Sequence, residues 1–126
     1  YKLNISITRA LHQGGAQLLL GTDATKSNVL PGFSVHEELQ HFVEAGLTPY
    51  EAIRAGTSDA AIFLHQESEF GVVATGRRAD LLLLEANPLK DVKNVSKRAG
   101  VMVNGRWHTE AELQQRLAAL RASYQR

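Results

Sequence analysis

An apolar run from Ala16 to Leu20 lies between Gly15 and Gly21. A nearly continuous apolar run of this length is typical of a strand that is covered on both faces, as in parallel α/β sheets. The run therefore predicts a buried strand and places the chain in the α/β class. The first residues with a candidate chemical role directly follow the end of this strand.

A helix is predicted directly before the strand. Apolar positions recur at helical spacing between Asn4 and His12, and the Gly14-Gly15 pair can adopt the left-handed conformation that commonly ends a helix. The residues expected on its apolar face are Ile7, Ala10 and Leu11. Helix, tight turn and buried strand make one αβ unit, and the turn-forming residues of segment 24–33 predict a surface loop after it.

Three further helices are predicted: one over 34–45, one over 48–55, and a third that Thr57 or Ser58 could cap. Ser34 and Glu37 match the capping box S-x-x-E at the start of the first, and Gly46 ends it. Thr48 and Glu51 repeat the capping signal for the second. The third is expected to face inward through Ala60, Ala61, Phe63 and Leu64.

The periodicity changes to that of strands after Gly71. Val72-Val73 and Leu81–Leu84 predict a first β-hairpin around a turn at 75–77. Asn104-Gly105 is a strong two-residue turn signal and predicts a second hairpin from the strands 101–103 and 106–108. A final helix is expected from a capping box of Thr109 and Glu112, with an apolar stripe of Leu113, Leu117 and Leu120.

Charge and composition argue against several classes of partner. The 14 basic and 13 acidic residues are scattered and leave a net charge of +1, so nucleic acid is not expected to bind. No apolar run approaches the roughly 18 to 20 residues that span a bilayer, so no membrane partner is expected either. The absence of cysteine excludes thiolate metal sites but leaves the cellular compartment open.

Asp23 is the leading candidate for chemistry. It ends the tripeptide Gly21-Thr22-Asp23 directly after the predicted strand, where parallel α/β enzymes collect catalytic groups. A carboxylate there can ligate a metal or accept a proton. Capping of the following turn is an equally good account of this residue from local sequence alone.

The order of several segments resembles the C-terminal third of amidohydrolase-superfamily enzymes. These segments are LLLGTDA, PGFSVHEELQHFVEAGLTPYEAIRAGTSDAA, GVVATGRRADLLLLEANPLKDV and VMVNGRW. The HEEL and EAGLTPYEAI segments are similar to the imidazolonepropionase-like and Xaa-Pro dipeptidase-like branch. The resemblance implies a C-terminal part of a TIM-type (β/α)8 barrel, namely strand eight with its helices, followed by part of a small β-sandwich domain and a C-terminal helix. The corresponding boundaries are 1–66, 67–108 and 109–126.

The resemblance also implies a role for Asp23. In the family the matching aspartate ligates a divalent metal, with zinc expected, and acts as general base in hydrolysis of a C–N bond in an amide, cyclic amide or dipeptide. The family's histidine and lysine ligands lie on earlier barrel strands, which this sequence lacks. We therefore expect the 126 residues alone to bind no metal and to be inactive, and to need the missing barrel segments or self-association to cover their apolar faces.

Two residues besides Asp23 are of interest, and two other functions are compatible with the sequence. His36 falls in the first turn of the helix after the loop and is a candidate for substrate binding, against a solvated histidine beside Glu37 and Glu38. Asp80 is read as structural. A non-catalytic assembly or interaction module and a deaminase of the same superfamily are the alternative functions.

Overall fold

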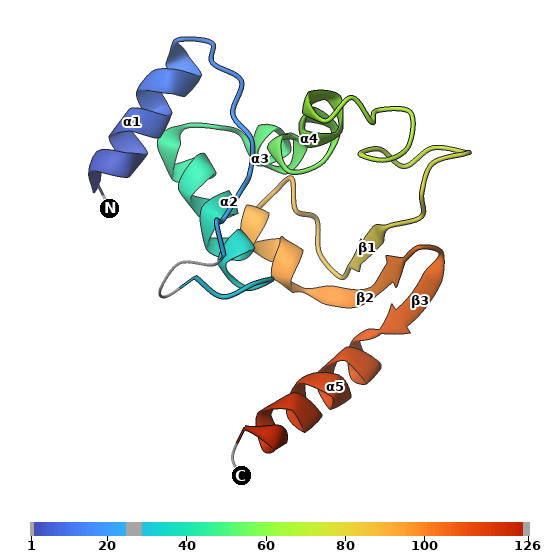
Figure 1. Cartoon of the computed structure of the whole chain (residues 1–126). Helices are drawn as coiled ribbons and strands as arrows, with labels where there is room; N and C mark the ends of the chain where they lie inside the picture. The colour runs from blue at the N-terminus through green and yellow to red at the C-terminus, as the bar shows by residue number, and fades with distance from the viewer. Residues whose placement is uncertain (1, 25–28, 125–126) are drawn as a thin grey trace.

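The computed structural model describes residues 2–24 and 29–124. Its first half contains helices, and its second half contains a small antiparallel sheet followed by a C-terminal helix (Figure 1). In chain order the elements are α1 (Lys2–Gln13), α2 (Ser34–Ala45), α3 (Pro49–Ala55), α4 (Ser58–Phe63), β1 (Leu81–Leu84), the 3₁₀-helix η1 (Val92–Ser96), β2 (Arg98–Val103), β3 (Arg106–Thr109) and α5 (Glu110–Ser123). All five predicted α-helices are therefore confirmed.

The hydrophobic core lies between α1, α2, α3 and η1. Its buried members are Ile5, Leu39, Phe42, Ala45, Leu47, Ala52, Ala55 and Val92. Sequence patterning missed η1, because a single buried valine in a polar stretch carries no periodic signal. Val92 is nevertheless only 5% exposed and completes the core against α2.

Helix α1 packs through a different face from the predicted one. Ile5 is buried, whereas Ile7 and Leu11 are 49% and 48% exposed. The reason is the contact with α2: Arg9, one turn after Ile5, donates from Nη2 to the carbonyl of Glu44 at 2.8 Å and from Nε to that of Ala45 at 3.2 Å. These carbonyls end α2, where a cation is favourable.

Helix α2 begins where predicted but without the predicted capping box. Ser34 is the first helical residue, and its Oγ accepts a hydrogen bond from the N–H of Leu30 at 2.9 Å instead of capping the helix. The helix ends as expected at Gly46, whose φ of 115° lies in the left-handed region and whose N–H bonds back to Phe42 and Val43. Of the predicted loop 24–33, residues 25–28 lie outside the described residues, and 31–33 form a turn.

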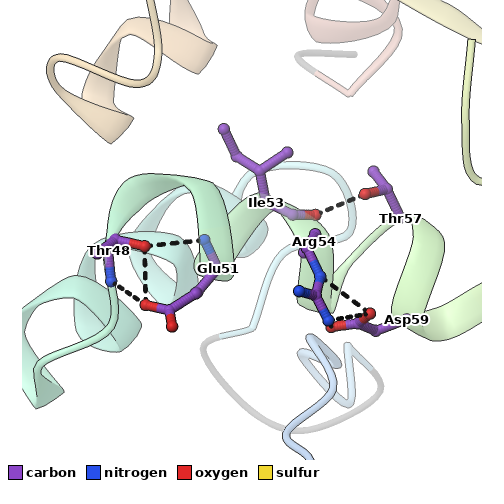
Figure 2. Close-up of polar contacts among 6 residues, drawn as sticks. All are labelled: Thr48, Glu51, Ile53, Arg54, Thr57 and Asp59. Carbon is purple, nitrogen blue, oxygen red and sulfur yellow. Dashed lines mark hydrogen bonds and ion pairs between the residues drawn. The ribbon is translucent and has the colours of Figure 1, made fainter.

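Polar contacts fix the ends of α3 and its junction with α4 (Figure 2). The predicted capping box is present, because Thr48 accepts from the N–H of Glu51 while the Glu51 carboxylate accepts from the N–H of Thr48 at 2.7 Å. Beyond the helix end, the carboxylate of Asp59, 8% exposed, accepts from Arg54 Nη2 at 2.9 Å. Thr57 turns its hydroxyl back to the carbonyl of Ile53.

Helix α4 buries fewer residues than predicted. Ala61 is buried and Ala60 half-buried, whereas Phe63 and Leu64 are 66% and 55% exposed. The helix is only six residues long, so a single turn faces the core and its end leaves it. The expected inward face is therefore wrong for its last two members.

The predicted strand at 16–20 is not paired with any other strand of the described chain. These residues are extended, but the three-stranded sheet of the described chain is β1-β2-β3 and does not include them. A strand is defined by its partners, and the N–H of Leu20 donates to the carbonyl of Ala55 at the end of α3 instead of to another strand. The apolar residues Leu18, Leu19 and Leu20 are each half-buried.

The first predicted hairpin is also wrong, and the second is confirmed. Val72 and Val73 are exposed and not in a strand, whereas β1 pairs antiparallel with β2 in the register Leu82 to Val101. Strands β2 and β3 form the predicted hairpin around Asn104 and Gly105. Both turn residues have positive φ, 49° and 76°, as a type I′ turn requires.

Helix α5 leaves the end of β3 and points away from the other helices (Figure 1). The predicted capping box of Thr109 and Glu112 is confirmed, and Glu110 accepts two hydrogen bonds of 3.0 Å from Arg98 in β2. The leucine stripe is only partly covered, since Leu120 is 55% exposed. Among the described residues, no helix is both long and apolar enough to cross a bilayer.

Candidate functional site

The extended segment before Asp23 is held against the end of α3. The N–H of Leu20 donates to the Ala55 carbonyl at 3.1 Å. The Leu20 side chain also lies directly on Gly56, where an added Cβ would be only 2.8 Å from Leu20 Cδ2. The glycine is therefore needed for this close approach, and it sets how near the segment lies to the helix.

A second contact comes from α2. The N–H of Gly21 donates to Oε1 of Glu38 at 3.0 Å. The other carboxylate oxygen, Oε2, is buried and has no hydrogen-bond partner among the described residues. Glu38 is not among the residues predicted for the site, although the sequence carries a signal for it. It falls three residues after Val35 and four before Phe42, on the apolar side of the helix.

Asp23 lies two residues beyond this contact and is exposed. Its φ of 50° is in the left-handed region, which aspartate tolerates better than most residues. The backbone thus turns sharply at the end of the extended segment. An exposed carboxylate at such a turn is sterically able to act as an oxygen ligand for a divalent metal.

The described residues supply one such ligand position and no complete metal site. A zinc site takes about three protein ligands, and no group of three His, Cys, Asp or Glu side chains is gathered within residues 2–24 and 29–124. A metal at Asp23 therefore needs further ligands from residues outside this described set.

His36 lies in the first turn of α2 and is half-buried. Its N–H donates to the carbonyl of Phe33, and its own carbonyl accepts from Nε2 of Gln40 at 2.9 Å. The backbone of this turn is thus fixed by neighbouring groups. A role for the imidazole in substrate binding stays a prediction.

Asp80 has the structural position expected of it. Its Oδ1 accepts from the N–H of Asn104 at 2.7 Å, and Oδ2 accepts from Arg78. The Asn104 N–H, and secondarily Arg78, hold the pKa of this carboxyl below its usual value. Asp80 therefore fastens the chain before β1 to the turn of the β2–β3 hairpin.

A groove of about 800 Å³ lies between the helices and the sheet. Its lining is mainly apolar and includes Leu20, Leu39, Ile53, the leucines of β1 and Trp107. Among the described residues that line it, Asp23 and His36 do not occur. The groove is an uncovered apolar surface and is separate from the candidate ligand.

Comparison with known protein families identifies the family to which this chain belongs. A model of the amidohydrolase family matches residues 4–108. The chain belongs to the amidohydrolase family. The resemblance inferred from the sequence motifs is thereby confirmed.

Two curated relatives match about two thirds of the chain. The chain is 39% identical over 83 residues to an ochratoxinase of Aspergillus niger, a match that covers 64% of this chain and 16% of the relative. It is 40% identical over 83 residues to an imidazolonepropionase of Rubrobacter xylanophilus, covering 62% of this chain and 19% of the relative. The chain thus spans less than a fifth of either relative.

A solved structure gives the same result for the fold. The crystal structure of a putative prolidase from Bifidobacterium longum superposes with a TM-score of 0.74 at 34% identity. The superposition covers 82% of this chain and 26% of the other. The mixed helix and strand arrangement described above is therefore that of an amidohydrolase segment.

Proposed function

We propose that this chain forms part of a metal-dependent hydrolase acting on a C–N bond, and that Asp23 is a metal ligand and the general base of that enzyme. The observation that carries the proposal is the position of Asp23 at a sharp turn after an apolar segment held by two helices, within a region that matches the amidohydrolase family. The names of the relatives, ochratoxinase, imidazolonepropionase and prolidase, support a small-molecule or dipeptide substrate.

The fold in the complete protein is part of this proposal. Residues 1–66 would end a TIM-type barrel with strand eight, 67–108 would belong to a small β-sandwich domain, and 109–126 would add the C-terminal helix. Two features support it: the apolar segment 16–20 lacks a strand partner in the described chain, and the groove beside it is apolar. Neighbouring barrel strands would cover both.

A bound metal and the side chains of this chain would have different roles in the hydrolysis. A bound divalent metal, with zinc expected, would supply electrostatic activation of water and of the scissile carbonyl. The Asp23 carboxylate would hold the proton released in hydrolysis, which requires it to lie within hydrogen-bond distance of the reacting group. His36 would contact the substrate from the first turn of α2.

The test uses the complete protein that contains this chain. Asp23→Ala and Asp23→Asn are compared with the wild type for bound divalent metal by plasma mass spectrometry and for hydrolysis of a panel of Xaa-Pro dipeptides and cyclic amides. Asp91→Asn serves as a matched control, since Asp91 caps η1 far along the chain. We expect about one or two ions per wild-type chain and a loss of metal and activity only in the Asp23 variants. Equal metal content and activity in all four proteins would refute the proposal.

A further inference from the structure

Glu38 lies on the apolar side of α2, and its carboxylate contacts the segment that leads to Asp23. Oε1 accepts the N–H of Gly21 at 3.0 Å, across 17 residues of sequence. This is the ordinary length of an N–H···O hydrogen bond, which requires an oxygen acceptor on the side chain. The contact therefore fixes a backbone position two residues before the candidate ligand.

We propose that Glu38 is a positioning residue for Asp23, holding the Gly21–Asp23 turn in the orientation in which the Asp23 carboxylate can act. The inference rests on the proposed function of Asp23 and adds to it the residue that sets the geometry. Groups that orient a ligand without touching the metal have strong effects, since their loss typically lowers metal affinity or activity by about 10- to 100-fold.

The Glu38 carboxylate accepts from a backbone N–H that has no strand partner in the described chain. An extended segment without a strand partner leaves its N–H groups to be satisfied by other acceptors. Leu20 finds the carbonyl of Ala55, and Gly21 finds Glu38. Neighbouring Glu37 is exposed, so it provides a control of the same charge.

The second carboxylate oxygen of Glu38 makes no such contact, which guides the choice of variants. Oε2 is buried and lacks a partner among the described residues, so the role assigned here depends on Oε1 alone. Glu38→Gln keeps an oxygen acceptor for the Gly21 N–H but removes the charge. Glu38→Ala removes the acceptor, and Glu38→Asp withdraws it by one methylene group.

The experiment measures two quantities in the complete protein. Hydrogen exchange of the peptide segment 20–23 reports the backbone contact, and competition with a chelator reports zinc affinity. We expect faster exchange and a zinc affinity lower by about 10- to 100-fold in Glu38→Ala, a smaller change of the same sign in Glu38→Asp, and values near wild type in Glu38→Gln and Glu37→Ala. If Glu38→Ala fails to fold, the comparison of Glu38→Asp with Glu38→Gln decides the question.

The outcomes separate this inference from the proposed function. Unchanged exchange and affinity in Glu38→Ala, or equal losses in Glu38→Ala and Glu38→Gln, would overturn the positioning role. Asp23→Ala is measured beside them. If it leaves zinc affinity intact, the proposed function fails. If it abolishes zinc binding while Glu38→Ala does not weaken it, only the inference about Glu38 fails.

Discussion

Replacing Gly56 by alanine should disturb the candidate ligand through a single steric contact. The new Cβ would lie 2.8 Å from Leu20 Cδ2, about 0.6 Å inside the 3.4 Å at which ordinary contact begins. Gly56 has a φ of −100°, which alanine accepts, so the clash is the main cost. Overpacking of this kind costs about 1–3 kcal/mol, and the stiffer unfolded chain returns about 0.4–1 kcal/mol.

The net effect expected for Gly56→Ala is a loss of up to about 2.6 kcal/mol of unfolding free energy, measured by urea denaturation. The Leu20 side chain must shift, and its Cβ, at 3.3 Å from the added methyl group, is crowded as well. We expect this shift to reach the Gly21–Asp23 turn and to lower zinc affinity in the complete protein. Gly46→Ala is the matched control. Its φ of 115° costs about 1–2 kcal/mol in strain, yet no atom lies within 4 Å of the added Cβ.

Both variants should therefore lose stability, but only Gly56→Ala should lose zinc affinity. A second check is Leu20→Ala, which removes the Cδ2 atom that clashes. Combined with Gly56→Ala, it should give a smaller loss of stability than the sum of the single losses. The reasoning is refuted if Gly46→Ala weakens zinc binding as much as Gly56→Ala, or if the two losses of stability are simply additive.

Two further predictions concern stability. In Gly100→Ala the added Cβ would clash with the ring of Trp107, so the melting temperature should fall, with a cost of about 1–3 kcal/mol. Adding Trp107→Leu should partly relieve this loss. An unchanged melting curve would contradict the close packing of Gly100 against Trp107. The N–H groups of Thr48 and Thr109 hold the pKa values of Glu51 and Glu112 below the usual 4.5. The stability contributed by these two carboxylates is therefore present above pH 4.5 and is lost as the pH falls through their lowered folded-state pKa values. The urea midpoint of the wild type should fall in that pH range, and that of the double variant Glu51→Gln/Glu112→Gln should fall less.

Local signals predicted those parts of the fold whose causes are local. The capping box of Thr48 and Glu51, the stop at Gly46 and the Asn104-Gly105 turn each depend on a few neighbouring residues, and each is present. Ser34 carried the same signal and failed, because Leu30 supplied a competing donor for its hydroxyl. A capping pattern shows that a cap is possible and does not show which partner the side chain takes.

Pairing over long distances could not be predicted in this way. The leucines of β1 were correctly read as a strand, but their partner is β2 rather than the nearby Val72-Val73 segment. Strand registers depend on packing between distant parts of the chain, which periodicity does not encode. For the same reason the apolar run 16–20 indicated a strand although the described chain offers it no partner.

The candidate site combines one predictable residue with one that was not. Asp23 could be selected because motif order and its place after an apolar run both point to it. The contact that positions it could not, because Glu38 reaches Gly21 only after α2 has packed beside the extended segment.

The two anchors of this segment have complementary directions. Successive N–H groups of an extended backbone point to opposite sides. The N–H of Leu20 bonds to the end of α3 and that of Gly21 to the side of α2, so two helices hold consecutive residues from two directions. A single bond would leave the segment free to pivot about it, whereas two bonds at adjacent residues fix its rotation. The orientation of Asp23 thus depends on α2 and α3 together, which is why a change at Gly56 and a change at Glu38 should reach the same carboxylate.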